Sequence, residues 1–525
     1  MTGPGGRSIV TATARRVKVF AGTYLDSVLQ MAGTRAMLDV DGVDWAAAAM
    51  ATPANLATLG EKGFDRGELG GASANDLFVA VAASDEGTAE EALAAAEERL
   101  FAPSRNGAKA DGTERQPRTL GEALDLQSAT NVAVISVPGD YAALEAHKAL
   151  SAGLHVLLFS DNVSVEDEVA LKDRATELGR LVMGPGAGTA MLGGIGLGFA
   201  NVVRPGRVGV VAAAGTGAQE AMSLLDRWGV GVSSVIGLGG RDLTDAVGGR
   251  MAKLAVAAMA DDPGTDAILL VSKPPSERVA REVVGLARGT PLVASLVGLK
   301  SEMDLPDGVT VVTTLEEGVV QTMGVLGLDV PDLVAGLPDA VEAAGARIGP
   351  ERTLVRGLFS GGTLCYESLV ILSRLLGPVW SNTPLDKAYR VPAPLDAHSC
   401  LDLGEEEYTK GRPHPMIDPE ARIEFIREAG QDGQVAVVLI DVVLGHGSHP
   451  DPAGELAPVC AEITADGGPI VVAYVLGTDG DPQGLAGQRA RLTDAGCIVT
   501  ATAARASLAA AAIATRRPSL VTAAP

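Results

Sequence analysis

At 525 residues the chain is long enough for roughly three or four domains with full hydrophobic cores. Its 42 basic and 65 acidic residues leave a formal net charge of −23, which argues against nucleic acid or an anionic membrane as a partner. The four cysteines are widely scattered and no apolar run approaches the roughly 20 residues that span a bilayer. We therefore expect a cytoplasmic protein without a structural metal site.

The N-terminal part, residues 1–102, is predicted to form a small α/β domain. Apolar strand-like and helical segments alternate along it, which indicates helices packed on a small sheet, for example in a ferredoxin-like arrangement. Residues 103–125 are predicted to be a linker, because their first part is polar and rich in glycine, proline and charge.

Residues 126–203 are predicted to form a partial Rossmann-like domain. Three continuous apolar strands are separated by two helical segments with short crossovers, which favours a parallel sheet. The third strand runs into GPGAG (residues 184–188). This loop is either part of a ligand site at the carboxyl edge of the sheet or a simple turn.

The rest of the chain contains one unit twice. VGVVAAAGTGAQEA (residues 208–221) is echoed by VRGLFSGGTLCYES (residues 355–368), with Glu220 and Glu367 at the same offset. Further strands recur in the same order; DAILLVSK (266–273), for instance, is echoed by QVAVVLID (434–441). This order predicts two tandem flavodoxin-like domains, at residues 204–335 and 345–525, and an α/β fold overall.

Each repeat has a Gly-Thr turn that opens a helix. Such a turn presents unpaired backbone N–H groups at the positive end of a helix dipole, which suits a phosphate group. We expect the two turns to face one anionic site, and a tight strand-to-helix junction is the plainer alternative for each. The expected phosphate-binding residues are Gly215, Thr216, Gly217, Gly361, Gly362 and Thr363.

Five further side chains are candidates for the chemistry. Lys273 ends a strand and is followed by two prolines, and Arg241 follows a glycine-rich turn; either could neutralise a bound anion or be a solvated charge. His414, His446 and His449 lie in loops of the second repeat that glycine and proline restrain. At least one of them is expected to act as general acid or base, or to polarise a carbonyl group. Cys365 is expected to be a packing residue.

Several motifs together resemble the α subunit of succinyl-CoA synthetase and the NDP-forming acyl-CoA synthetases, and within them the FdrA family. The motifs span nearly the whole chain: ATPAN (51–55), FANVV (199–203), GLGGRDL (237–243), VSKPP (271–275), SGGTLCYE (360–367), GRPHPMIDP (411–419) and LGHGSHPDPAG (444–454). The resemblance implies a CoA-binding-type Rossmann domain followed by two flavodoxin-like ligase domains fused in one chain. It also implies that the two facing helix N-termini hold a phosphoryl group, and that companion subunits complete the assembly.

The chain departs from those synthetases in ways that bear on its reaction. They carry phosphate on a histidine in a Gly-His-Ala-Gly-like loop, whereas this chain has no histidine between His155 and His398. It also lacks an ATP-grasp domain and the early glycine-rich turn of a complete CoA domain.

The resemblance to FdrA proteins implies a phosphate-dependent carbamoyltransferase of the oxamate carbamoyltransferase type, acting in allantoin breakdown with phosphate or carbamoyl phosphate as substrate. An NDP-forming acyl-CoA ligase that takes CoA and a nucleotide is one alternative. A non-catalytic scaffold subunit is another.

Overall fold

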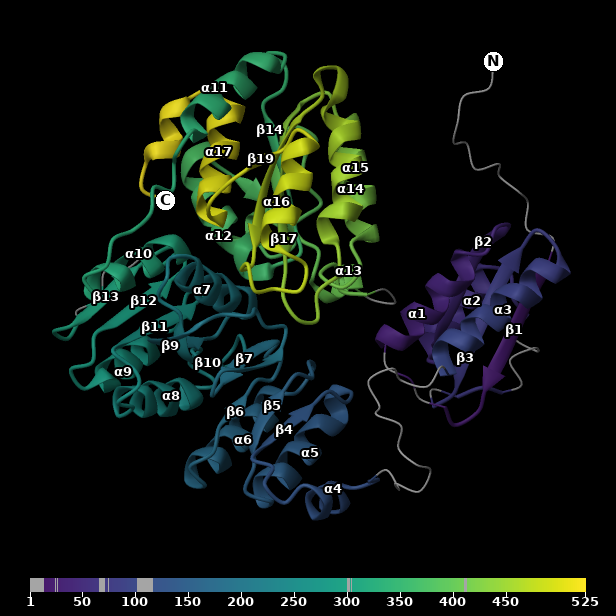
Figure 1. The fold of residues 1–525 in the computed structure, drawn as a ribbon, viewed down its shortest axis with the longest axis horizontal. Helices are drawn as coiled ribbons and strands as arrows, with labels where there is room; N and C mark the ends of the chain where they lie inside the picture. The colour runs from purple at the N-terminus through teal and green to yellow at the C-terminus, as the bar shows by residue number, and fades with distance from the viewer. Residues whose placement is uncertain are drawn as a thin grey trace. The chain divides into compact units, whose positions relative to one another are not determined.

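The computed structural model describes residues 14–23, 25, 27–65, 71–73, 75–101, 117–299, 303, 305–409 and 413–525 (Figure 1). The chain divides into two compact units. One comprises Met1–Gln116 with Lys410–Pro413, and the other comprises Pro117–Thr409 with His414–Pro525. Strands and helices alternate in both, which confirms the α/β class. No helix among the described residues is long and apolar enough to cross a membrane.

The first unit is a three-stranded antiparallel sheet with helices on both faces. Its central strand β3 (Leu77–Ala83) is buried along its whole length. Alternate β3 side chains enter two separate cores, one against α1 and α3 and the other against α2. The remaining elements are β1 (Ala14–Phe20), α1 (Ser27–Leu38), β2 (Val43–Met50), α2 (Pro53–Glu61) and α3 (Glu86–Phe101). The sandwich predicted for this part therefore has a helix on each side.

The second unit begins with a small parallel sheet, as predicted, of strand order β4-β5-β6. Much of the predicted linker lies outside the described residues, but its last part forms α4, which Thr119 caps by accepting a bond from the Glu122 N–H. The elements are α4 (Leu120–Leu126), β4 (Val132–Ile135), α5 (Gly139–Ser151), β5 (His155–Leu158), α6 (Val165–Glu177) and β6 (Val182–Met183).

The first repeat is built on a seven-stranded sheet of order β13-β12-β11-β9-β10-β7-β8. The hairpin β7–β8 precedes the repeat in sequence but extends its sheet, because β7 pairs antiparallel with β10. The elements are β7 (Thr189–Leu192), β8 (Ile195–Gly198), β9 (Pro205–Ala212), α7 (Gly215–Arg227), β10 (Val232–Gly237), α8 (Arg250–Ala260), β11 (Ala267–Ser272), α9 (Glu277–Val284), β12 (Leu292–Leu296), β13 (Val309–Val312) and α10 (Leu315–Val325).

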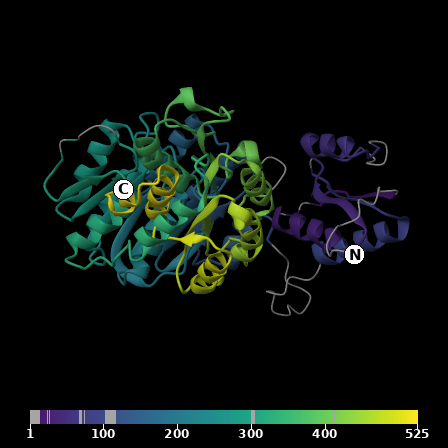
Figure 2. The same cartoon turned by 90° about the horizontal axis from the view of Figure 1, so that it is seen from above.

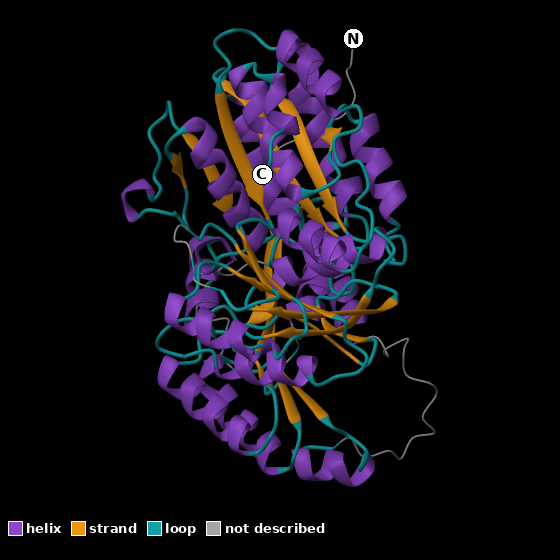
Figure 3. Cartoon of the chain, turned by 90° about the vertical axis from the view of Figure 1, so that its left-hand side faces the viewer, coloured by secondary structure: helices purple, strands orange, loops and turns teal. Residues whose placement is uncertain are grey.

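The second repeat is built on a six-stranded parallel sheet of order β15-β16-β14-β17-β18-β19. In Figure 1 its strands lie between α14 and α15 on one side and α12 and α17 on the other, and Figures 2 and 3 show the same unit from two further directions. The elements are α11 (Leu337–Arg347), β14 (Leu354–Phe359), α12 (Gly362–Leu376), β15 (Val379–Trp380), β16 (His398–Asp402), α13 (Glu406–Thr409), α14 (Glu420–Gln431), β17 (Val435–Val443), α15 (Pro452–Thr464), β18 (Ile470–Leu476), α16 (Leu485–Asp494), β19 (Ile498–Val499) and α17 (Ala503–Thr515).

The two repeats share one strand order. Numbered from β9 and β14, and leaving out the edge strands β7, β8 and β15, both sheets read 2-1-3-4-5. This is the flavodoxin-like order, in which ligands bind beyond the carboxyl ends of strands 1 and 3, where the order reverses. One continuous hydrophobic core joins the repeats through α7, α10, α12 and α17.

Candidate functional site

The two Gly-Thr turns are in direct contact. They follow the first strands of the two repeats and open α7 and α12. The N–H of Thr363 donates to Thr216 Oγ1 at 3.1 Å. A Cβ added to Gly217 would lie 3.0 Å from Thr363 Cγ2, so only glycine allows this approach without a shift. The structure thus places the start of each helix against the other.

A carboxylate binds the N–H groups at the start of the second Gly-Thr turn. Asp441, on β17, accepts from the Ser360 N–H at 2.8 Å and from the Gly361 N–H at 2.7 Å. Arg422 pairs with Asp441 at 3.1 Å, and both side chains are almost completely buried. An internal, charge-balanced anion therefore binds Gly361, one of the three residues of this turn that the sequence led us to expect at a phosphate, and the Thr363 N–H is taken by Thr216.

The turn of the first repeat is open. Strand register places Val271, not Lys273, at the position equivalent to Asp441, which shifts the repeat alignment of these strands by two residues. The N–H groups of Gly215, Thr216 and Gly217 have no hydrogen-bond partner among the described residues, and Gly215 is exposed. At the equivalent positions of the second repeat, the Thr363 N–H is bound by Thr216 Oγ1, and that of Gly362 has no hydrogen-bond partner among the described residues.

Asp402, which the sequence reasoning missed, lies at the carboxyl end of β16. Its side chain is 3% exposed, and burial raises its pKa to about 7 against the opposing charge of Lys273. Its Oδ1 accepts from the Gly404 N–H at 3.0 Å, and its Oδ2 would lie 2.4 Å from a Cβ added to Gly362. Asp402 thus faces the start of α12. The sequence did hold a signal for this residue, because Asp402 in LDLGE stands where the first repeat has the glycine of IGLGG.

Lys273 crosses from the first repeat to this region. It follows β11, and its Nζ lies 5.4 Å from the ring centroid of Tyr366 on α12. Among the described residues it has no ion pair or hydrogen bond. Its charge lowers the pKa of Asp402, so it is available to act on that carboxyl and on a bound anion.

Of the three candidate histidines, the structure brings His414 closest to Asp402. A Cβ added to Gly404 would lie 2.6 Å from His414 Nε2 and 3.2 Å from Asp402 Oδ1, so both atoms lie beside the same position. Burial lowers the pKa of His414 to about 4. Its Nδ1 accepts from the Met416 N–H at 3.2 Å, which leaves the proton on Nε2. His414 is thus a neutral hydrogen-bond donor, and the first residues of its loop, 410–412, lie outside the described part.

The other two histidines are held differently. His449 Nδ1 accepts from the Asp451 N–H at 3.1 Å, and the His449 N–H donates to the Met416 carbonyl, which ties this loop to that of His414. The side chain of His446 is exposed, and its backbone pairs with Ala200. These contacts give His449 a supporting position and leave His446 at the rim.

Arg241 is committed elsewhere. Its guanidinium lies 2.8 Å from Glu168 on α6 and donates to the Val163 carbonyl at 2.8 Å. Beside it, the fully buried Lys172 contacts Glu168 and Asp242, so this is a charge-balanced structural cluster. The expectation that Arg241 serves the Gly-Thr turns is therefore corrected, because its charge is already neutralised. Burial raises the pKa of Cys365 far above its usual range, in agreement with a packing role.

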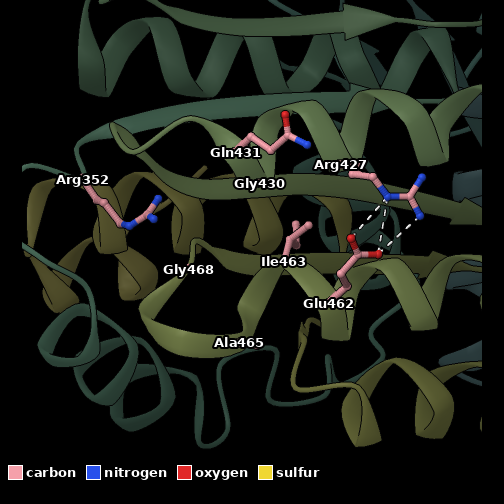
Figure 4. A pocket seen from close by; sticks show the side chains of 8 residues that line it. All are labelled: Arg352, Arg427, Gly430, Gln431, Glu462, Ile463, Ala465 and Gly468. Atoms are coloured by element: carbon pink, nitrogen blue, oxygen red, sulfur yellow. Dashed lines mark hydrogen bonds and ion pairs between the residues drawn. The ribbon is translucent and has the colours of Figure 1, made fainter. Parts of the chain in front are cut away.

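A surface hollow of about 260 Å³ lies at the opposite, amino edge of the second repeat (Figure 4). It is lined by the last turns of α14 and α15, and the exposed ion pair of Arg427 and Glu462 forms part of its wall. Helix C-termini repel anions. The hollow therefore does not fit the expected phosphate, and the carboxyl edge around Asp402 remains the candidate site.

Comparison with known proteins matches two families. The CoA-ligase family matches residues 358–513, and the family described as "AllF, heavy metal-associated domain" matches residues 13–117. The second description does not fit a thiolate or imidazole metal site, because the chain has no cysteine before Cys365 and no histidine before His147. Among the described residues there is also no group of three or more His, Cys, Asp or Glu side chains placed to hold a metal ion.

Three individual proteins show how far the likeness extends. The α subunit 2 of the ADP-forming succinate–CoA ligase of Archaeoglobus fulgidus is 29% identical over 42% of this chain and 72% of its own length. A solved acetyl-coenzyme A synthetase from Ca. Korarchaeum cryptofilum is 17% identical, covers 75% of this chain and 84% of its own, and has a TM-score of 0.28, too low to compare domain arrangements. YahF, an uncharacterized protein of Escherichia coli, is 38% identical over 94% of this chain and 97% of its own length. The chain therefore belongs to one family with YahF, and its residues 358–513 match the CoA-ligase family.

Proposed function

We propose that this protein is an FdrA-type subunit of a phosphate-dependent carbamoyltransferase, converting oxalurate and phosphate into oxamate and carbamoyl phosphate together with companion subunits. The proposal rests on the position and pKa of Asp402. This buried carboxyl has a pKa of about 7 and lies close to the neutral His414. A carboxyl that is partly protonated at neutral pH can supply a proton to a leaving group.

The reaction needs such a donor. A phosphate oxygen attacks the carbamoyl carbon, the bond from that carbon to the amide nitrogen breaks, and the nitrogen leaves as the amide of oxamate after taking one proton. We assign that proton to Asp402. The Nε2–H of His414 would donate to the carbamoyl oxygen as negative charge develops there, and Lys273 would offset the charge of the incoming phosphate.

We assign phosphate to the first Gly-Thr turn, where the N–H groups of Gly215, Thr216 and Gly217 have no partner among the described residues, and not to the second turn, where the N–H groups of Gly361 and Thr363 are bound. The chain is strongly acidic, so an anion needs such a local site. This narrows the expectation drawn from the sequence, in which both turns shared the ligand.

Two comparisons support the proposal. The match to an AllF domain is consistent with a role in allantoin breakdown. The CoA-ligase match covers residues 358–513, and from this we infer that the Gly-His-Ala-Gly-like loop of the resembling synthetases has its counterpart after β18. There the chain reads Gly484-Leu485-Ala486-Gly487, with the buried Leu485 in place of histidine. We infer that no phosphohistidine forms at that position.

The alternative is an NDP-forming acyl-CoA ligase, which the names of the succinate–CoA ligase relatives favour. The deciding experiment purifies the full chain with its co-encoded subunits and assays two reactions. One is carbamoyl phosphate formation from oxalurate and phosphate, and the other is thioester formation from CoA, a nucleotide and a carboxylic acid. Product in the second assay alone would establish the ligase, and no product in either would indicate a scaffold subunit.

Variants of Asp402 test the assigned role. D402N should lower turnover by about 10²–10⁴-fold, the usual contribution of a general acid, and should abolish the decline of activity above about pH 7. D396N, which changes an exposed carboxyl shortly before β16, is the matched control and should leave turnover unchanged. K273M should move the alkaline limb to higher pH, because Lys273 lowers the pKa of Asp402. Full activity of D402N would remove Asp402 from the mechanism.

A further inference from the structure

Two equivalent glutamates cross between the repeats, behind the Gly-Thr turns. Glu220 lies on α7 and Glu367 on α12, and each is 1% exposed. Glu367 Oε1 accepts from the Leu315 N–H at 2.6 Å, at the first residue of α10 in the other repeat. Glu220 accepts from the backbone N–H of Ala503, at the first residue of α17 in the other repeat, and from the Tyr474 hydroxyl at 2.5 Å.

The arrangement has the same pseudo-symmetry as the sequence repeat. Helices α10 and α17 are the equivalent last helices of the two repeats, and each has a threonine N-cap, Thr314 or Thr502, that bonds an N–H one turn further on. A second N–H at each helix start is bound by the glutamate of the opposite repeat. The two repeats therefore cap each other, and separating them would leave both helix starts without these partners.

The surrounding charges do not balance both carboxylates. Glu316 and Glu317 on α10 face Glu367. Arg505 on α17 pairs with Glu316, and Arg227 on α7 donates to the Ala501 carbonyl and the Tyr474 hydroxyl. Arg489 on α16 lies near Tyr474. Two ionised glutamates would thus be buried together, with Arg227 as the only cation that acts on Glu220 among the described groups.

Burial accordingly raises the pKa of Glu220 to about 7 and that of Glu367 to about 8. The neighbouring Glu220 adds to the shift of Glu367. Both carboxyls are therefore protonated in slightly acidic solution and ionise across the neutral range.

We propose that Glu220 and Glu367 form a reciprocal pair of protonated caps that holds the two repeats together and weakens when both ionise, so that the inter-repeat contact is a pH-sensitive switch. The inference goes beyond the proposed reaction and does not depend on it. Because α7 and α12 begin at the Gly-Thr turns, weakening this pair also loosens the contact between Thr216 and Thr363.

The sign of the effect follows from proton binding. In the closed state the two groups keep their protons up to about pH 7 and 8, whereas exposed glutamates lose theirs near pH 4.5. Opening therefore releases protons, and the opening constant should rise about tenfold per pH unit for each carboxyl between roughly pH 5 and 7, then level off above pH 8.

Infrared spectroscopy of the full chain tests the protonation state directly. The wild type should show a protonated-carboxyl band at pH 6 that disappears between pH 6 and 9. The measurement is repeated in a D402N background, because Asp402 also titrates near neutrality. E220Q and E367Q should each remove part of the remaining band and the double variant all of it, whereas E462Q, at an exposed ion pair, should remove none. A wild-type protein without the band, or a double variant that keeps it, would overturn the proposal.

Hydrogen exchange tests the coupling between protonation and opening. After correction for the intrinsic pH dependence of exchange, protection of the amides at the starts of α10 and α17 should fall from pH 5.5 to 8 in the wild type. It should stay constant in the double glutamine variant, since glutamine keeps the acceptor oxygen without the charge. Equal slopes in the two proteins would refute the switch. If the double variant does not fold, the wild type alone still tests the proposal. Protection that stays constant from pH 5.5 to 8 would contradict it.

Discussion

The two Gly-Thr turns of this protein share a sequence motif, a place in the fold and a helix that follows, yet they differ in what they can bind. In the second repeat Asp441 occupies the N–H groups of Ser360 and Gly361 and is balanced by Arg422. In the first repeat the equivalent position is Val271, whose carbonyl accepts from the Ala213 N–H, and the N–H groups of Gly215, Thr216 and Gly217 have no partner among the described residues. The same motif thus has its first N–H group bound by a side-chain carboxylate in one repeat and by a backbone carbonyl in the other.

The largest effect should come from removing the cation of the occupied turn. R422M leaves the Asp441 carboxylate buried without its partner, and we expect a loss of about 3–5 kcal/mol in the free energy of unfolding. R427M, on the same helix α14, breaks an exposed pair with Glu462 and should cost at most about 1 kcal/mol. Urea denaturation measures both. Similar losses in the two variants would mean that Asp441 is not held as an internal anion.

A smaller effect should appear in the pH dependence of the free energy of unfolding, through His414 of the second repeat. His414 has a pKa of about 4 in the folded chain against an ordinary 6.5, so the unfolded chain binds more protons between these values. Stability should therefore fall as the pH drops from 6.5 to 4, by about 3 kcal/mol from this residue. H414N keeps an acceptor for the Met416 N–H and should remove that part of the slope. An unchanged slope in denaturation curves across this range would contradict the buried, neutral histidine.

The smallest effect compares one substitution at equivalent positions. In G362A the new methyl group would lie 2.4 Å from Asp402 Oδ2, and crowding of this kind costs about 1–3 kcal/mol. In G215A it would meet nothing within 4 Å, so stability should stay the same or rise by at most about 1 kcal/mol through helix propensity. Melting temperatures of the two variants give the answer. Equal shifts would show that the second turn is not closed by the carboxylates around it.

The sequence predicted the fold class and the repeat well, because both depend on local patterns. Continuous apolar strands, short crossovers and a Gly-Thr junction recur in order, and the shared 2-1-3-4-5 strand order follows from them. The motif also predicted that the two turns face each other at one anionic site; the turns do lie together, with the Thr363 N–H donating to Thr216 Oγ1, and the anionic site stays a prediction.

The occupancy of the site could not be predicted in the same way. Asp441 reaches Ser360 only because β17 and β14 are neighbours in one register, and the sequence alignment had matched Asp441 with Lys273 instead. Asp402 gains its raised pKa from burial beside a turn on another strand. Arg241 looked available in the sequence because its partner Glu168 is distant along the chain. Each of these properties depends on tertiary packing and not on local pattern.

The segment FANVV has a practical consequence for dissecting the protein. Asn201 donates to Asp481 and to the Leu444 carbonyl, and the Val202 N–H donates to Asp481 as well, so a stretch that precedes the first repeat is bound into the second. A fragment that starts at residue 204 would strip the buried Asp481 carboxylate of these donors and leave it the Thr478 N–H. A fragment cut at the start of the first repeat would therefore have a damaged second repeat. A fragment that carries both repeats should begin upstream of the β7–β8 hairpin.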